Sequence, residues 1–127
     1  MATQESLTCI TLEAGADLSG DQYKLVTLSA GKAVLCSAAT DAPVGVLQNK
    51  PASGQAATVC ISGASKLLAG GTIASGDLVG TDASGTADKK IAGTDTTEYV
   101  VGRALTGGAS GEVLTALINT EAPHRAS

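Results

Sequence analysis

One histidine and three cysteines are the side chains of this chain best suited to nucleophilic or metal chemistry. A hydrolytic triad needs a histidine close to a nucleophile and an acid, but His124 stands in a polar C-terminal segment. Cys9, Cys36 and Cys60 lie in apolar runs without a neighbouring histidine that would activate a thiol. The sequence therefore predicts no catalytic residue, and it predicts three reduced, buried thiols.

Residue types that bind metals are present, but their spacing fits no metal site. The cysteines and the histidine are tens of residues apart and include no Cys-x-x-Cys pair, which is typical of structural zinc sites. The alternate acids and closing glutamate of a calcium loop are also missing from the loop-like segments of the second half. Those segments contain Asp77, Asp82, Asp88 and Asp95. We expect a solvated acidic face there, with no metal and no cofactor.

Two lysine-containing segments resemble ligand-carrying motifs. Gly31-Lys32 lacks the first glycine and the hydroxyl residue of a phosphate-binding loop. Asp88-Lys89 resembles the hairpin tip at which lipoyl and biotinyl carrier domains present a lysine, although it lies in a loose Gly, Thr and Asp segment. A carrier-like barrel-sandwich module is therefore the alternative hypothesis, with a cofactor mass expected on Lys89 or Lys90.

An internal repeat organises the chain. Residues 44–61 align without a gap with residues 101–118, a shift of 57, and seven of the eighteen aligned positions are identical. Each copy has an apolar pair around a glycine, an Ala-Ser-Gly turn and then an apolar run, which is the pattern of a β-hairpin. A weaker match of residues 14–21 with residues 69–77 extends the unit. The sequence thus predicts two copies of one unit, at about 7–63 and 62–118.

Short strand-like segments recur along the chain, and no segment has apolar residues at helical spacing over several turns. We expect strands at residues 7–12, 22–29, 33–37, 98–105 and 112–118, besides the repeated hairpins. Residues 62–68 fit either a strand or a helical turn, and residues 81–88 read as a polar loop. The expected fold class is all-β: a small β-barrel or sandwich of two repeated hairpin-rich halves, with at most one short helical turn.

Composition limits the partners of the protein. The formal net charge is −4, and the eight Lys and Arg residues are scattered apart from Lys89-Lys90, so the clustered cations of a nucleic-acid site are missing. No apolar run approaches the ~20 residues of a membrane span. The first residues also lack the basic start and apolar centre of a signal peptide. We expect no nucleic-acid partner, no membrane partner and a protein that stays soluble after synthesis.

The core must be built from small side chains. The chain has no Phe or Trp and only two Tyr among its 127 residues. Each fully buried aliphatic side chain contributes about 1.5–3 kcal/mol, so this core gives a modest stabilisation against chain entropy. This indicates stabilisation by other subunits. We expect a flexible N-terminal arm at 1–6, a single β domain at 7–118 and a frayed tail at 119–127.

The order of the glycine-rich motifs resembles that of the small capsid cement or decoration proteins of tailed bacteriophages, a family long catalogued as a phage protein of unknown function. The resemblance covers about residues 7–118. Its motifs are, in order, Pro43-Val44-Gly45-Val46, Gly54 with Val59 and Gly63, Ala69-Gly70, Ile73, Ser75-Gly76-Asp77-Leu78-Val79 and Val101-Gly102-Arg103-Ala104-Leu105.

The resemblance implies a β-rich structural protein without enzymatic activity. Proteins of this family bind the outer surface of an assembled head, commonly as homotrimers, and staple neighbouring major capsid protein subunits. The implied location is the outer capsid surface of the virion, after synthesis in the host cytoplasm. Our own hypothesis adds the polar N-terminal arm as a capsid contact. Its residues are Met1, Ala2, Thr3, Gln4, Glu5 and Ser6.

Overall fold

The computed structural model describes residues 5–121 and 124–126, and these residues form strands and loops with no helix. The all-β prediction is therefore confirmed, without the short helical turn. The first strands are β1 (Glu5–Glu13), β2 (Leu25–Ser29), β3 (Lys32–Leu35), β4 (Gly45–Leu47) and β5 (Ala56–Leu68). They are followed by β6 (Leu78–Thr81), β7 (Ala87–Lys89), β8 (Tyr99–Val100), β9 (Gly102–Ala104), β10 (Val113–Asn119) and β11 (His124–Arg125).

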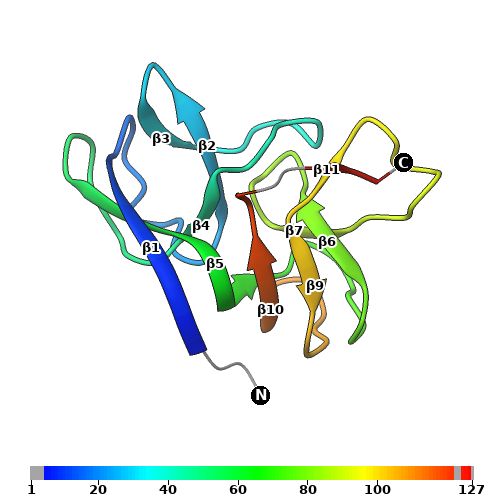
Figure 1. Cartoon of the computed structure of the whole chain (residues 1–127). Coiled ribbons are helices and arrows are strands. Elements are labelled where there is room, and N and C mark those ends of the chain that lie inside the picture. Colours follow the sequence, from blue (N-terminus) through cyan, green and yellow to red (C-terminus); the bar gives the residue numbers. More distant parts are fainter. Residues whose placement is uncertain (1–4, 122–123, 127) are drawn as a thin grey trace.

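One curled sheet holds nine of these strands (Figure 1). Its path runs β3-β2-β4-β5-β10-β9-β6-β7, and β1 pairs with the other edge of β5. The strands β11 and β8 form a separate two-stranded sheet. The long strand β5 thus joins the two halves: β1 pairs along one edge, and β4 and β10 pair with successive parts of the other edge.

The two halves of the sheet pair in matching registers. In the first half β4 pairs with β5 through Val46↔Cys60 and Leu47↔Val59. In the second half β9 pairs with β10 through Arg103↔Leu117 and Ala104↔Ala116. Adding 57 to each number of the first set gives the second set, so the repeat seen in the sequence is also a repeat of strand pairing.

Strand β5 belongs to both repeats. Its first part pairs with β1 through Leu12↔Ala57, and its second part pairs with β10 through Leu67↔Leu114 in the equivalent register. We call β1 to residue 61 the first unit and residue 62 to β10 the second unit. Residues 62–68, ambiguous in sequence, are thus strand, continuous with residues 56–61 through Gly63, whose φ is 116°.

Three sequence expectations on strands need correction. The segment 81–88, expected as a polar loop, contains Thr81 of β6 and the start of β7. The single strand expected at 98–105 is two strands, β8 and β9, which pair with different partners. The strand expected at 22–29 begins only at Leu25, because Tyr23 has a positive φ of 67° that an extended strand does not allow.

The expected terminal segments fall partly outside the described residues. Residues 1–4 of the expected arm lie there, whereas Glu5 and Ser6 belong to β1. Part of the expected frayed tail is ordered: β11 pairs with β8, and Ala126 is only 3% exposed. The amide of Ala126 donates to the carbonyl of Glu98 at 2.9 Å, which ties this segment to the loop before β8.

Small aliphatic side chains build two cores. One cluster lies within the first unit and is made of Ala14, Leu18, Val26, Ala33, Leu47, Ala57 and Val59. The other joins the second unit to one side of the first and includes Leu25, Cys36, Val46 and Cys60 with Val79, Leu114 and Ile118. The two units are therefore packed on each other through the second cluster.

Gly102 makes the closest backbone approach in the repeated hairpins, and replacing it tests the strand packing. A Cβ at this position would overlap the main chain of Leu117, and one at the equivalent Gly45 would overlap the carbonyl of Cys60. We expect Gly102→Ala to lower the free energy of unfolding by about 1–3 kcal/mol in urea denaturation. Gly20→Ala is the matched control, because no heavy atom lies within 4 Å of its Cβ position. Equal stability of the two variants would contradict this packing.

Candidate functional surface

The histidine lies on a short strand near the C-terminal end of the chain. His124 lies on β11, exposed, opposite Val100 of β8. Within residues 5–121 and 124–126, no three His, Cys, Asp or Glu side chains are close enough to hold a metal ion. The described part of the chain also has no helix that could span a membrane.

The cysteines are free, and two of them are protected by burial. Burial raises the pKa of the Cys36 thiol to about 12, although a hydrogen bond with the Thr81 side chain lowers it. Burial also raises the pKa of Cys60. Cys9 is exposed on β1, so the expectation of three buried thiols is wrong for this residue. Neither buried thiol has the thiolate character of a nucleophile.

The loop aspartates stabilise turns. Asp77 accepts a hydrogen bond from the amide of Ala74 at 2.9 Å, and Asp95 accepts one from the amide of Ile91 at 2.7 Å. Asp82 accepts hydrogen bonds from the amides of residues 84 and 86 and from the hydroxyl of residue 86. These carboxylates therefore satisfy local backbone donors, as Asp does in turns, and are more than a solvated face.

The lysines do not have the geometry of a carrier domain. The Lys90 side chain has no exposed area and forms ion pairs with Asp88, at 3.3 Å, and with Glu98. Lys89 is half exposed, but it is the last residue of β7 and lies 3.8 Å from Asp77. A carrier lysine must stand at an accessible hairpin tip, whereas the β6–β7 turn is made by residues 82–86. The structure therefore does not favour the carrier alternative.

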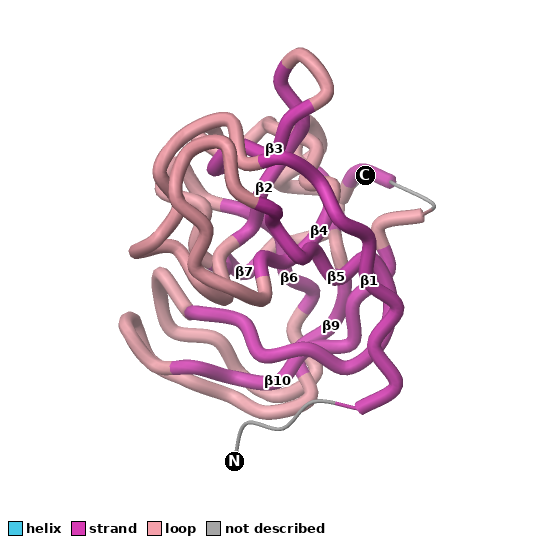
Figure 2. The backbone as a smooth tube through the Cα atoms, turned by 90° about the vertical axis from the view of Figure 1, so that its left-hand side faces the viewer, coloured by secondary structure: helices cyan, strands magenta, loops and turns pink. Residues whose placement is uncertain are grey.

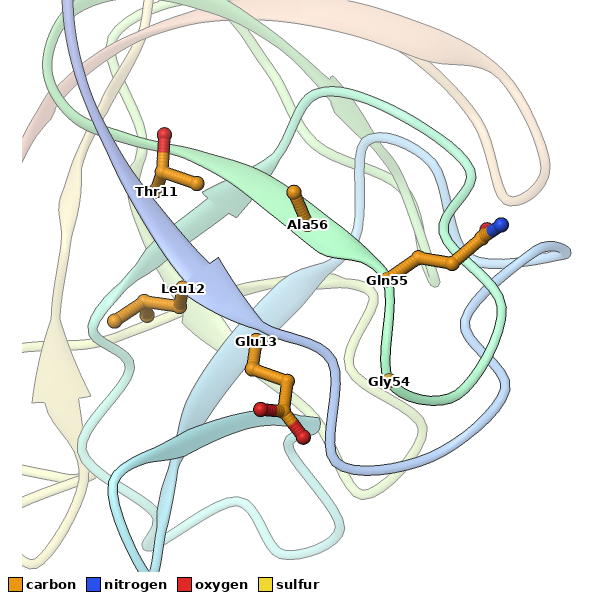
Figure 3. A pocket seen from close by; sticks show the side chains of 6 residues that line it. All are labelled: Thr11, Leu12, Glu13, Gly54, Gln55 and Ala56. Atoms are coloured by element: carbon orange, nitrogen blue, oxygen red, sulfur yellow. The ribbon is translucent and has the colours of Figure 1, made fainter.

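A shallow, open depression lies where β1 ends and β5 begins (Figure 3). Its only ionisable side chain is Glu13, which pairs with Lys32 at 3.1 Å. Its lining residues are Thr11, Leu12, Glu13, Gly54, Gln55 and Ala56. Its single carboxylate is already paired with Lys32 and its lining is small, so it offers little to hold a small ligand.

An apolar face lies on the outward side of the second unit. Leu105, Val113 and Leu117 are 46%, 39% and 52% exposed. Val113 and Leu117 lie four residues apart on β10 and therefore point to the same side of the sheet. The amide of Leu105 donates to the carbonyl of Thr115 at 2.8 Å, which places Leu105 beside β10. These exposed apolar side chains are adjacent rather than scattered, so this face is a candidate contact surface.

Two cations border this apolar face. Arg103 lies opposite Leu117 and Lys66 lies opposite Thr115, and directly paired residues point to the same side of a sheet. We define the outer face of the second unit as Ala64, Lys66, Leu68, Arg103, Leu105, Val113 and Leu117; Thr115, on the same side of β10, is only 3% exposed. Its members include two cations and no carboxylate, although the protein as a whole is acidic. It suits a partner with an apolar centre.

Strand β1 offers a second contact surface. Among the described residues it pairs with β5 along one edge only. Its free edge can therefore accept another strand. The residues expected to contact a capsid precede this edge: residues 1–4 are outside the described part of the chain, and Glu5 and Ser6 begin β1.

Comparison with known proteins gives a match among solved structures, and that match concerns the fold. No protein-family model and no curated protein match this chain. The solved structures include the crystal structure of the N base of the head fibre protein gp8.5 of bacteriophage phi29. The match covers 91% of this chain and 96% of that chain, with a TM-score of 0.65 and 21% identity. This chain has the fold of that fibre base.

The sequence does not reveal that the outer face of the second unit is exposed. Alternation along residues 113–119 shows that one side of the strand is buried, but it does not show whether the other side is covered. The repeat alignment held a signal, since Leu117 aligns with Cys60 and Arg103 with Val46. Cys60 and Val46 are fully buried, so equivalent positions have opposite environments in the two units.

Thiol labelling tests the different environments of the cysteines. In the folded protein at pH 8, we expect iodoacetamide to label Cys9 rapidly and to leave Cys36 and Cys60 unlabelled, because both are inaccessible and protonated. Labelling in urea should modify all three, as counted by mass spectrometry. Rapid labelling of Cys36 in the native protein would contradict the packing of the two units.

The buried Lys90 makes the stability sensitive to its partner. We expect Glu98→Gln to lower the free energy of unfolding by about 2–3 kcal/mol, because it leaves a buried ammonium group with only the half-exposed Asp88. Glu13→Gln breaks an exposed pair with Lys32 and should cost at most about 1 kcal/mol. Urea denaturation of both variants measures the difference. A loss no larger for Glu98→Gln than for Glu13→Gln would mean that Lys90 is solvated.

Proposed function

We propose that this chain is a structural subunit of a phage head, a decoration or cement protein that binds the outer surface and staples neighbouring major capsid protein subunits. The observation that carries the proposal is the fold shared with the phi29 head fibre base over nearly the full length of both chains. That protein is, by its description, part of a head fibre. The motif order in the sequence supports the same class of protein.

The site chemistry is compatible with this role. Asp77 caps a turn, Lys90 forms ion pairs, and no three His, Cys, Asp or Glu side chains of the described residues could hold a metal ion. A protein that acts by binding in many copies needs contact surfaces, and each contact can be modest because avidity multiplies them. The outer face of the second unit and the free edge of β1 are such surfaces. Two surfaces allow one contact with the shell and one with another copy.

The proposed assembly is a homotrimer whose partner is the major capsid protein. A core of small side chains gives modest stability to a single subunit, and association adds buried apolar area. In this proposal the segment 1–6 reaches the shell. It leads into β1, whose free edge can accept a strand. The acidic net charge keeps the free protein soluble before docking.

Binding to heads that lack the protein tests this function. We expect co-sedimentation with such heads to saturate at a number of copies divisible by three. Deleting residues 1–4 should reduce occupancy while leaving the melting temperature unchanged, because β1 begins only at Glu5. Deleting residues 1–6 should also destabilise the fold, since it removes Glu5, which pairs with Ala64.

The outcomes separate the parts of the proposal. No binding of the intact protein to heads in any expansion state would overturn the head-surface function. Full occupancy by the protein lacking residues 1–4 would overturn only the role of the arm.

A further inference from the structure

Two of the three cysteines face each other on neighbouring strands. Cys9 of β1 lies directly opposite Cys60 of β5, and the register between these strands is regular from Cys9 to Glu13. Directly opposite residues of an antiparallel pair point to the same side of the sheet. In Figure 2, β1 lies beside β5 at the edge of the molecule. The two thiols are therefore neighbours, although about fifty residues of chain separate them.

Main-chain hydrogen bonds show which kind of pair this is. The amide of Gln48, which follows β4, donates to the carbonyl of Thr58 at 2.8 Å. Alternate residues direct their main-chain groups to the same edge of a strand, so Cys60 also points its main chain toward β4 and away from β1. Cys9 and Cys60 are therefore a non-hydrogen-bonded pair, the kind with the closer Cα atoms, at about 4.5 Å. This separation lies within the ~4.4–6.8 Å that a disulfide bond spans.

The two thiols differ in exposure. Cys9 is exposed and Cys60 is buried. Burial raises the pKa of the Cys60 thiol, and a nearby charge on Cys9 raises it further, although the hydrogen bond between Cys60 and Ser62 lowers it. The influence of Cys9 is a second sign that the two sulfur atoms are close. Cys36 is too far away to take part, because β2 and β4 lie between β5 and the strand β3 that it follows.

We propose that Cys9 and Cys60 form a cross-strand disulfide bond in an oxidising medium, and that both remain thiols in the cytosol. Cytosolic reductants keep thiols reduced, whereas disulfide bonds persist outside the cell. The exposed Cys9 reacts first with the oxidant, and the buried Cys60 completes the bond.

The oxidant is a low-molecular-weight disulfide such as oxidised glutathione. The Cys9 thiolate attacks one of its sulfur atoms, so that a mixed disulfide forms and one glutathione thiolate leaves. Cys60 then loses its proton and attacks the Cys9 sulfur, which releases the second glutathione. The two cysteines together lose two protons and two electrons, and the oxidant is reduced to two thiols.

The bond anchors the N-terminal segment to the central strand. Among the described residues β1 is paired along one edge only, so a pull on residues 1–4 breaks its hydrogen bonds one after another from Glu5. A bond at Cys9 stops this loss and passes the load to β5, which also pairs with β4 and β10. This use of the bond rests on the proposed function, in which the N-terminal segment contacts the shell.

Counting thiols after oxidation tests the bond. The reduced protein is treated with oxidised glutathione, unfolded in urea and alkylated with iodoacetamide. We expect alkylation of Cys36 alone instead of all three cysteines, and a disulfide-linked pair of peptides that contain Cys9 and Cys60. Cleavage before Asp41 separates Cys36 from Cys60 for this assignment by mass spectrometry. Glutathione retained on Cys9, or a link between the Cys9 residues of two chains, overturns the inference.

Two variants serve as matched controls. Cys36→Ser should keep the bond. Cys9→Ser combined with Thr8→Cys should lose it, because adjacent residues of a strand point to opposite faces of the sheet. Circular dichroism before oxidation checks that both variants are folded. A bond that forms equally well with Thr8→Cys overturns the register on which the inference depends.

The melting temperature gives an independent measurement. The oxidised protein should melt roughly 5–15 °C above the same protein kept in reductant, because the bond closes a long loop of chain. The Cys9→Ser variant should show no such rise. An unchanged or lower melting temperature of the disulfide-bonded wild type overturns a bond that fits the native fold.

Release from heads separates the bond from its use. Oxidised protein should stay on heads at urea concentrations that release the reduced form. Equal release of the fully disulfide-bonded protein overturns the anchoring role and leaves the bond standing. Failure of both forms to bind heads overturns the proposed function instead, and the thiol count then decides the bond by itself.

Discussion

Strand β5 is the element on which both halves of the molecule depend. It runs for thirteen residues, and its first part pairs with β1 and β4 while its second part pairs with β10. The two units share this strand, so ordering it for one unit also orders the starting strand of the other. A duplicated sequence thereby gives two units that share one strand and one apolar cluster, and neither unit has to stand on a core of small side chains alone.

Backbone constraints explain why two glycines of the repeated hairpin are shared by both units. Gly45 and Gly102 lie where a neighbouring strand leaves no room for a Cβ. The turn glycines Gly54 and Gly111 both have positive φ, at 84° and 87°. At these two positions both units carry glycine, because the backbone excludes a Cβ at the first and has a positive φ at the second.

The repeat pattern predicted the fold class and both hairpins, because strand pairing depends on alternation and turns that a sequence displays. It did not predict that β5 is continuous, since Ser62-Gly63 has the composition of a turn and only pairing on both edges keeps it extended. Strand β7 was missed because the preceding loop is held by Asp82, whose hydrogen bonds are set by the folded loop. The outer face of the second unit was missed because exposure depends on what the other unit covers.

Equivalent positions of the two units show how far packing can change chemistry at one place in the fold. The amide of Cys36 donates to the carbonyl of Leu25, and the amide of Lys90 donates to that of the equivalent Leu78. Both residues are buried. One is a neutral thiol against Thr81, and the other is a cation that Asp88 and Glu98 neutralise.

Leu28 and Thr81, which occupy equivalent positions on the β2–β3 and β6–β7 hairpins, also differ in burial. The buried one carries a threonine, and the exposed one, Leu28, carries a leucine. Residue type alone does not explain this arrangement, because threonine is more often exposed than leucine. The two hairpins differ in what they meet: the carbonyl of Gly85 accepts a hydrogen bond from the amide of Leu25, whereas no heavy atom lies within 4 Å of a Cβ position on the equivalent Gly31. A duplicated fold thus supplies its own reference for what each surface contacts.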